Sequence, residues 1–347
     1  MANPKRRIIP VFIPNEGCSN NCVFCDQRRI TGAPPVDLRD VSDFINSVLQ
    51  DKRKPSPLEV AFYGGSFTAL TVELQISLLE AARPLLALDP LNSIRISTRP
   101  DFIDEQILDR LQSYGVKTIE LGAQSMCDDV LSASDRGHTP QDVEDASSLI
   151  KSKGFSLVLQ MMTGLPEDSA EKSIFTAKRL IGLSPDAVRI YPTVVIKGSR
   201  LYELWKSGAY AEHTVADAVA LCAELCPMFF DAGIPVIRLG LNPTAELSSG
   251  SAAAGAYHPS LGELVYSRIY YNKAEKLLMG VTPGSDVVLA VSKGAASKMT
   301  GSRRRNIEAL TAKFSLRSLK VIETDLPPGK VVTHPGEVKF FIENHRR

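Results

Sequence analysis

The sequence lacks any apolar run approaching the ~20 residues that a membrane-spanning helix needs, and it has only six cysteines in 347 residues. That cysteine density is far below that of small secreted domains held together by disulfides, so a disulfide framework is a poor explanation for it. The formal net charge is only +1, so the chain as a whole has no strong attraction to polyanions. No repeat of fixed period and no long low-complexity tract is present, so a repeat architecture is not indicated.

A cleavable leader is not indicated by the first residues either. The segment MANPKRRIIPVFIP places basic residues before a short apolar stretch, but that stretch holds two prolines and leads directly to cysteines. No small-residue cleavage site comes between them. We therefore expect a strand in this segment, a cytoplasmic protein and no association with a membrane.

Short β-type runs alternate with longer helical patterns over the first 240 residues. Thr139 before Pro140 is a helix start that ends at Gly154, and Thr214 begins a helix that ends at Gly233. This alternation indicates parallel βαβ units in an α/β fold, and six or seven units fit a partial or full barrel better than an open doubly wound sheet. The number of units alone does not separate these folds. The expected strands span residues 8–13, 58–63, 93–97, 117–121, 155–161, 186–191 and 234–241.

The pattern changes after Asn242. Residues 243–257 are small, polar and Gly-rich and are expected to form a loop or lid, followed by a helix over 258–278. From Ser285 onward the chain has twelve Lys and Arg against six Asp and Glu, and it offers three short strands around one basic helix. The predicted strands span 285–294, 318–325 and 337–343, and the predicted helix spans 302–314. The predicted parts are a barrel (1–245), a lid loop with a connecting helix (246–284) and a small basic α/β domain (285–347).

Half of the cysteines lie in one short stretch, EGCSNNCVFCDQ, as Cys18, Cys22 and Cys25. Zinc usually takes four ligands, and the first histidine, His138, is more than a hundred residues away. One disulfide would leave an odd thiol. An iron–sulfur cluster is normally held by four thiolates, so three would leave one iron open to bind something else.

The spacing C-x3-C-x2-C, with the aromatic Phe24 before the last cysteine and a predicted strand before the loop, resembles the radical S-adenosylmethionine (radical SAM) superfamily. The resemblance implies a partial (β/α)6-type TIM barrel in which Cys18, Cys22 and Cys25 hold a [4Fe–4S] cluster. It also implies that the open iron binds SAM, which the reduced cluster cleaves to a 5′-deoxyadenosyl radical. An electron donor such as a flavodoxin or ferredoxin is then required.

Other positions match the family at the ends of predicted strands, where barrel enzymes keep their sites. The turn Gly64-Gly65-Ser66 follows the second strand, and the resemblance implies that its backbone approaches the methionine end of SAM. Glycine suits this approach because a Cβ would block it. The family often has Glu where this chain has Ser66. The resemblance further assigns cofactor contacts to Gln124, Ser125, Arg136 and Gln160, and for Arg136 the contact is the SAM carboxylate, which suits a guanidinium.

Over residues 8–240 the segments STRPDFID, ELGAQS, DRGHT, MMTGLP and RIYPTVVIKGSRLYELWKSG resemble the radical SAM domain of the catalytic subunit of Elongator. Oxygen-independent coproporphyrinogen oxidase is more distantly similar. The Elongator resemblance implies RNA, and within RNA tRNA, as substrate, and we expect no acetyltransferase domain after the matching region. Cations on the basic segment are candidate phosphate contacts or a solvated helix face: Lys298, Arg303, Arg304, Arg305 and Lys313.

Candidate substrate-side residues follow the last predicted barrel strand. Tyr257, His258 and Glu263 stand where a lid or a general acid–base group would lie. Alternatively, Ser260 and Glu263 form a helix capping box. Arg238, on the last strand, is a candidate for a substrate anion.

The sequence therefore predicts a radical SAM enzyme acting on RNA. The alternatives are radical chemistry on a small molecule such as a tetrapyrrole, a non-catalytic relative that binds haem or a cluster, and a structural zinc protein. The oligomeric state is not indicated.

Overall fold

The structure is a computed structural model that describes residues 7–13, 22–26, 30–31, 37–50 and 57–333. The chain divides into two compact units. The first holds residues up to 218 and from 228 to 259, and the second holds 219–227 and the residues from 260 onward. Helix α9 (Val215–Asp231) supplies residues to both. The three-part division at residues 245 and 284 stays a prediction.

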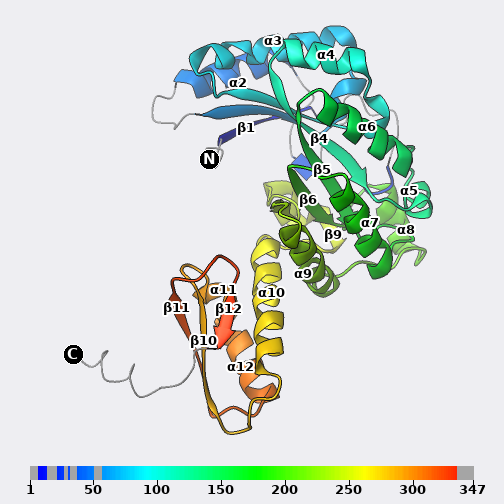
Figure 1. The fold of residues 1–347 in the computed structure, drawn as a ribbon. Coiled ribbons are helices and arrows are strands. Elements are labelled where there is room, and N and C mark those ends of the chain that lie inside the picture. Colours follow the sequence, from blue (N-terminus) through cyan, green and yellow to red (C-terminus); the bar gives the residue numbers. More distant parts are fainter. Residues whose placement is uncertain (1–6, 14–21, 27–29, 32–36, 51–56, 334–347) are drawn as a thin grey trace. The chain divides into compact units, whose positions relative to one another are not determined.

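A seven-stranded parallel sheet forms the centre of the first unit (Figure 1). The strands lie in the sheet in the same order as in the sequence, and all six pairs of neighbouring strands are parallel. Among the described residues, β1 and β8 are not paired with each other, so the sheet is an open partial barrel, as predicted. In order, the strands are β1 (Arg7–Phe12), β2 (Leu58–Tyr63), β3 (Ser93–Thr98), β4 (Val116–Gln124), β5 (Ser156–Thr163), β6 (Ala187–Pro192) and β8 (Val236–Leu239).

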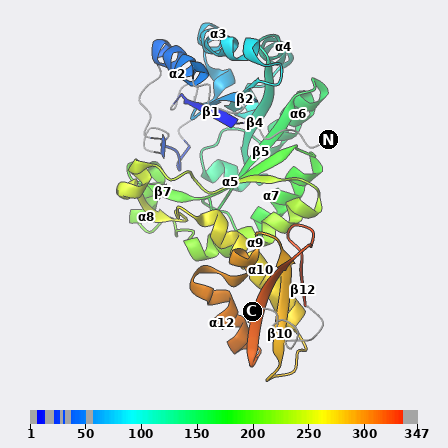
Figure 2. The same cartoon turned by 90° about the vertical axis from the view of Figure 1, so that its left-hand side faces the viewer.

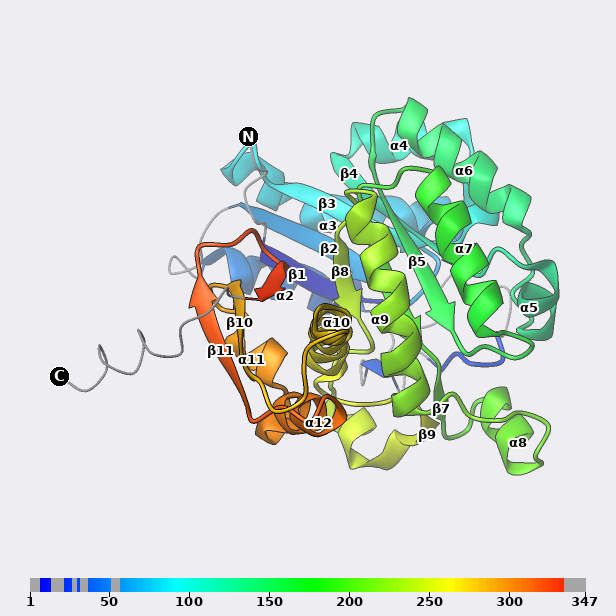
Figure 3. The ribbon, with the colours of Figure 1, turned by 60° about the horizontal axis from the view of Figure 1, so that its bottom comes forward.

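Helices cover one face of this sheet, with α3, α4, α6 and α7 along its outside (Figure 3). Several begin as the sequence predicts: Thr139 forms a capping box with Asp142 at the start of α6, and Thr214 does so with Asp217 at the start of α9. Gly154, with φ of 78°, follows the end of α6. The helices are α2 (Leu38–Gln50), α3 (Val72–Leu88), α4 (Glu105–Ser113), α5 (Asp128–Ala133), α6 (Pro140–Ser152), α7 (Ala170–Gly182) and α8 (Arg200–Lys206).

The inner strands β2 and β4 are almost fully buried, which is usual for parallel sheets. In β2 the first five residues of LEVAFY are all buried. Phe62 and Phe67 are fully buried, with ring centroids 5.2 Å apart. Burial of aromatic side chains of this size supplies a large share of core stability. This packing stabilises the interior of the sheet, while the C-terminal ends of its strands remain available for a site.

The expectation of a loop over residues 243–257 is wrong in part. A π-helical turn (Leu247–Ser251) and strand β9 (Ala252–Gly255) lie within it, and β9 pairs antiparallel with β7 (Val194–Ile196). Gly255 has φ of 87°, and a Cβ there would lie 2.7 Å from the carbonyl oxygen of Thr193. The small residues of β9 therefore let its backbone lie close to that of β7. Composition alone does not show whether a run of small residues forms such a strand or a loop.

The second unit has a three-stranded sheet with helices packed on it (Figure 2). Strand β10 (Asp286–Ser292) lies between β11 (Ser318–Thr324), which is parallel to it, and β12 (Val331–Thr333), which is antiparallel. The predicted third strand at 337–343 lies outside the described residues, and β12 was not predicted. Helices α10 (Leu261–Leu278), α11 (Ala296–Thr300) and α12 (Arg305–Lys313) share one hydrophobic core with the sheet.

Candidate radical SAM active site

A pocket of about 530 Å³ lies within the first unit. Every strand of the seven-stranded sheet contributes lining residues, several of them at the C-terminal ends of the strands. Open α/β sheets and barrels keep their ligand sites at these strand ends. The described lining residues include four arginines and no carboxylate. The pocket is therefore suited to anionic ligands.

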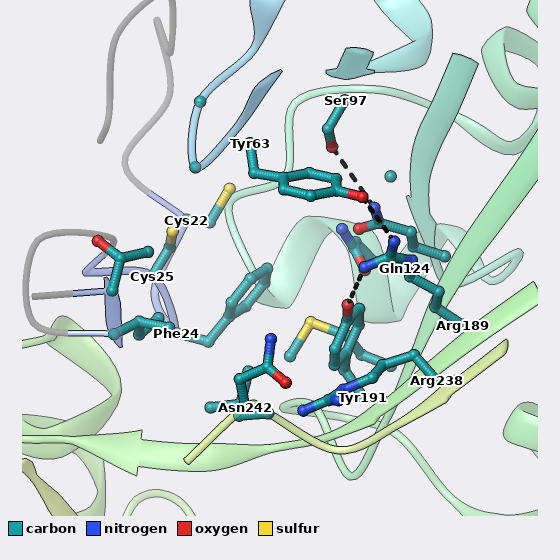
Figure 4. A pocket seen from close by; sticks show the side chains of 18 of the residues that line it. Cys22, Phe24, Cys25, Tyr63, Ser97, Gln124, Arg189, Tyr191, Arg238 and Asn242 are labelled. Carbon is teal, nitrogen blue, oxygen red and sulfur yellow. Dashed lines mark hydrogen bonds between the residues drawn. The ribbon is translucent and has the colours of Figure 1, made fainter. Parts of the chain in front are cut away.

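Cys22 and Cys25 both line this pocket (Figure 4). Cys22 is buried, and the amide of Cys25 donates to its carbonyl oxygen at 3.0 Å. Between them, Val23 donates to the carbonyl of Ser134 at 3.2 Å and accepts from the amide of Leu201 at 2.7 Å. These bonds fix the segment that presents the two thiols. The third predicted ligand, Cys18, lies outside the described residues.

The turn after β2 also lines the pocket with Gly64, Gly65 and Ser66. Gly64 has φ of 93°, a conformation that residues with a Cβ rarely adopt. Ser66 is buried and its hydroxyl lies 3.0 Å from that of Thr98 on β3. The hydroxyl of Ser66 therefore holds the turn against the neighbouring strand, while the glycines leave backbone open to the pocket.

Arg136 joins the cysteine segment to β4. It is buried, and its Nη1 lies 3.4 Å from Sγ of Cys22 while its Nη2 donates to the carbonyl of Gly122 at 2.8 Å. Gln124, at the end of β4, has φ of 63°, and its Oε1 has no hydrogen-bond partner among the described residues. A Cβ on Gly122 would lie within 2.8 Å of both side chains. This glycine therefore gives both residues room beside the thiols.

The other two predicted cofactor contacts differ in position. Gln160 lines the pocket, and its Nε2 donates to Glu120 at 3.0 Å. Ser125 is buried and does not line the pocket. Its hydroxyl accepts from the amide of Cys127 at 3.2 Å and lies 3.4 Å from that of Thr176. A direct cofactor contact by Ser125 stays a prediction.

A buried ion network borders the pocket, with Tyr63 and Arg189 in the lining, and sequence reasoning missed it. Oε1 of the fully buried Glu120 accepts from Arg95 at 2.6 Å, Arg189 at 2.7 Å and Tyr63 at 3.2 Å. Arg95 also donates to Glu59 at 2.7 Å. Burial and the charge of Glu120 raise the pKa of Tyr63, which keeps its hydroxyl protonated. The sequence did contain a signal for this network: one charged residue in each of the strand segments LEVAFY and SIRIS, and Glu120 in KTIEL. Charged side chains in buried strands are almost always paired with one another.

His138 is a second buried polar group beside this site, and its Nε2 lies 3.1 Å from the carbonyl oxygen of Ala123. Burial, followed by the charge of Arg136, lowers the pKa of His138 to about 4. The folded protein therefore keeps this imidazole neutral between pH 4 and 6.5, where the unfolded chain takes up a proton. Stability should be flat above about pH 7 and fall as the pH drops towards 4.

We expect His138→Gln to remove this pH dependence. Between pH 7.5 and 4.5 the native protein should lose about 2–3 kcal/mol more unfolding free energy than the variant. Urea unfolding midpoints of both proteins at the two pH values measure this difference. Equal losses would show that His138 titrates alike in the folded and unfolded states.

The candidates on the substrate side that follow β8 and belong to the first unit do not line the pocket, although Tyr257 packs against a cluster that includes the lining residues Val194 and Ile196. The hydroxyl of Tyr257 lies 3.1 Å from that of Ser248, and neither Tyr257 nor His258 is among the lining residues. Glu263 belongs to the second unit. Ser260 makes no side-chain cap at the start of α10, so the alternative of a capping box is not realised there. A catalytic role for Tyr257, His258 and Glu263 stays a prediction.

The predicted RNA-binding cations of the second unit fall into two groups. Arg303, Arg304 and Arg305 are exposed, and the described residues include no acidic partner for them. Lys313 instead pairs with Glu275 at 2.6 Å, and Nζ of Lys298 lies 4.9 Å from the ring centroid of Tyr266. The three arginines are therefore the cations left for an outside anion.

Two family models match successive parts of the chain: the Radical SAM superfamily over residues 12–179 and the Radical_SAM C-terminal domain over residues 185–271. The chain belongs to the radical SAM superfamily. The prediction of a radical SAM enzyme is thereby confirmed at the level of the family, whose members use SAM and an iron–sulfur cluster.

Among similar proteins, Elongator complex protein 3 of Bos taurus is 27% identical over 290 residues, which cover 72% of this chain and 52% of the relative. The tRNA uridine(34) acetyltransferase of Methanocaldococcus jannaschii is 27% identical over 303 residues, or 75% and 54%. The chain thus spans about half the length of these relatives.

Two solved structures share the fold. The archaeal Methanocaldococcus infernus Elp3 superposes with a TM-score of 0.60 at 22% identity, covering 77% of this chain and 63% of that one. Coproporphyrinogen III oxidase from Escherichia coli gives a TM-score of 0.50 at 22% identity, covering 67% and 54%. In the described part of the chain, no helix is long and apolar enough to cross a membrane.

Proposed function

We propose that this protein binds a [4Fe–4S] cluster through Cys18, Cys22 and Cys25, cleaves SAM reductively in the pocket, and acts on tRNA. The observation that carries the proposal is the meeting of two thiols, a glycine turn and a buried arginine in one cationic pocket at the ends of parallel strands. When bound, the cluster supplies the electron that cleaves SAM to methionine and a 5′-deoxyadenosyl radical.

The described residues fit these cofactors. Cys22 and Cys25 offer two thiols on one side of the pocket, although no group of three metal-ligating side chains occurs in the part of the chain that the structure describes. Gly64 and Gly65 have no side chains and so leave space for a ligand beside their backbone. Among the described residues, Oε1 of Gln124 is an acceptor without a hydrogen-bond partner. Such an atom in a buried place is costly unless a ligand satisfies it.

The chain's own residues would bind and orient SAM. The guanidinium of Arg136, fixed by the carbonyl of Gly122, would receive the SAM carboxylate beside Cys22. Gln160, held by Glu120, would offer its amide to the ribose hydroxyls. The apolar side chains of Phe24 and Phe12 would limit water in the pocket. Such exclusion matters because the protein's part in cofactor chemistry is positioning and shielding.

The proposal of tRNA as substrate rests on the relatives and on the second unit. One relative is named as a tRNA uridine(34) acetyltransferase. Arg303, Arg304 and Arg305 offer three exposed cations, and RNA phosphates are bound through such groups. Both observations favour a polyanionic substrate over a tetrapyrrole.

The test is anaerobic reconstitution with iron and sulfide, followed by reduction with SAM present. We expect 5′-deoxyadenosine to form, and its formation to rise when bulk tRNA is added. A rise with coproporphyrinogen and none with tRNA would replace the tRNA proposal by the tetrapyrrole alternative. An intact cluster that yields no 5′-deoxyadenosine with either substrate would contradict the proposed chemistry.

A charge-matched pair of triple variants tests the RNA surface. We expect replacement of Arg303, Arg304 and Arg305 by Gln to weaken tRNA binding and to lower the slope of log affinity against log salt by about 2–3. The control replaces Lys293, Lys313 and Arg317 by Gln, which removes the same charge from side chains that already pair with Asp325, Glu275 and Asp286. Equal losses in both variants would mean that only net charge matters.

A further inference from the structure

The arginine residues of the pocket are not equivalent. Arg136 lies beside Cys22, and Arg99 pairs with Asp101 at 2.7 Å. Arg189 donates to Glu120 at 2.7 Å, to Tyr63 at 2.8 Å and to the hydroxyl of Tyr191 at 3.1 Å. In each of these three guanidinium groups, at least one terminal nitrogen therefore donates to a neighbouring acceptor.

Arg238 is different. Its Nε donates to the carbonyl of Gly240 at 3.0 Å, which fixes the direction of the guanidinium. Among the described residues, its two terminal nitrogens have no hydrogen-bond partner and no carboxylate pairs with it. The side chain is partly buried, and this burial lowers its pKa, with the charge of Arg189 adding to the effect. A half-buried guanidinium that is held in direction, with two terminal nitrogens unpaired among the described residues, is available to bind an anionic group of a ligand.

The fold places this cation at a defined end of the pocket. Arg238 on β8 is the register partner of Arg189 on the adjacent parallel strand β6, so both side chains leave the sheet on the same face. In Figure 4, Arg189 and Arg238 lie on one side of the view and Cys22 and Cys25 on the other. The carboxylate of SAM, if bound by Arg136 beside Cys22, would lie away from Arg238.

We propose that Arg238 binds an oxyanion of the substrate, with the amide of Asn242, which lines the same pocket, as a second polar group. This inference rests on the proposed function, since it assumes that SAM occupies the thiol end of the pocket. Two hydrogen bonds from the terminal nitrogens of an arginine suit a phosphate or a carboxylate. Aromatic rings line the space between the thiols and Arg238, from Phe24, Tyr63 and Tyr191. The pocket therefore fits a substrate that joins a flat ring to an anionic group, as a nucleotide does.

The experiment is calorimetric titration of the reconstituted protein with uridine 5′-monophosphate, uridine and acetate. We expect the nucleotide to bind more tightly than uridine and Arg238→Gln to weaken nucleotide binding about tenfold or more while sparing uridine. Acetate binding that is lost in the variant, with the nucleotide no better than uridine, would identify a carboxylate as the anion. Arg83→Gln is the matched control, since it removes one cation that pairs with Glu80 on the outer helix α3.

Three results would overturn the inference: no binding of any probe, equal binding by Arg238→Gln and Arg83→Gln, or a loss of SAM affinity as large as the loss of nucleotide affinity. The last would assign Arg238 to the cofactor. None of these titrations requires turnover. Failure to form 5′-deoxyadenosine would therefore count against the proposed function and leave the binding result intact.

Discussion

The variant Cys22→Ser is expected to retain little iron after reconstitution and to form at least about 100-fold less 5′-deoxyadenosine than the native protein. The loss should exceed the 10–100-fold that removal of an outer partner of a metal ligand costs. Cys22 is buried in the pocket beside Arg136, and serine preserves its size while removing the thiolate that iron prefers. Iron content and the visible absorbance of the cluster measure the first effect, and chromatography of 5′-deoxyadenosine the second.

The control for this experiment is Cys127→Ser. The thiol of Cys127 is partly exposed and does not line the pocket, and its Sγ lies 4.0 Å from the carbonyl oxygen of Lys172. This variant should keep native iron content and native cleavage of SAM. A full cluster in Cys22→Ser, or equal losses in both variants, would remove Cys22 from the proposed ligand set.

The second large effect concerns stability. The variant Glu120→Gln should lower the free energy of unfolding by about 3–5 kcal/mol. Glutamine has nearly the same shape, so the change removes the charge without opening a cavity. It leaves Arg95 and Arg189 in a buried place with one carboxylate, that of Glu59, where there were two. A buried ion that loses its partner keeps its desolvation cost, which is the reason for the size of this effect.

Urea unfolding of Glu120→Gln measures this loss, and Glu144→Gln provides the comparison. Glu144 pairs with Arg179 on the partly exposed helical surface, where such a pair is worth about 0–1 kcal/mol. A loss below 1 kcal/mol in both variants would mean that water reaches the network around Glu120. Because Glu120 also holds Gln160 at 3.0 Å, the same variant should weaken SAM binding.

The parallel sheet was predictable because buried parallel strands are continuous apolar runs between helices with strong caps. Thr139 and Thr214 begin helices where predicted, and LEVAFY forms β2 without a shift in its bounds. Strand β9 escaped prediction because its sequence, AAAG, has low β-propensity, and pairing with β7 provides its stability. Strand β12 has only three residues, too few for an alternating pattern to be visible.

Part of the pocket lining was predictable, because the sequence marks it with a motif or with the end of a predicted strand. Cys22, Cys25, Gly64 and Gln160 line one pocket although they are distant in the sequence. The contacts of Glu120 were not predictable, because each pair joins strands whose register the sequence does not state. The same holds for Arg238, whose lack of a carboxylate partner among the described residues becomes visible only in the folded structure.

An open sheet has two free edges, and free edges invite pairing with strands of other chains. The amide of Arg7, which begins β1, donates to the carbonyl of Pro57 at 3.1 Å, and that of Ile13, directly after β1, donates to the carbonyl of Tyr63 at 2.7 Å. The amides of the even-numbered residues between them therefore face the other edge, which is unpaired among the described residues. The central one of these is Pro10, which has no amide hydrogen to donate. At the opposite edge, β8 has only four residues. A barrel left open for a ligand thus has one edge interrupted by proline and the other kept short, and both features oppose aggregation through added strands.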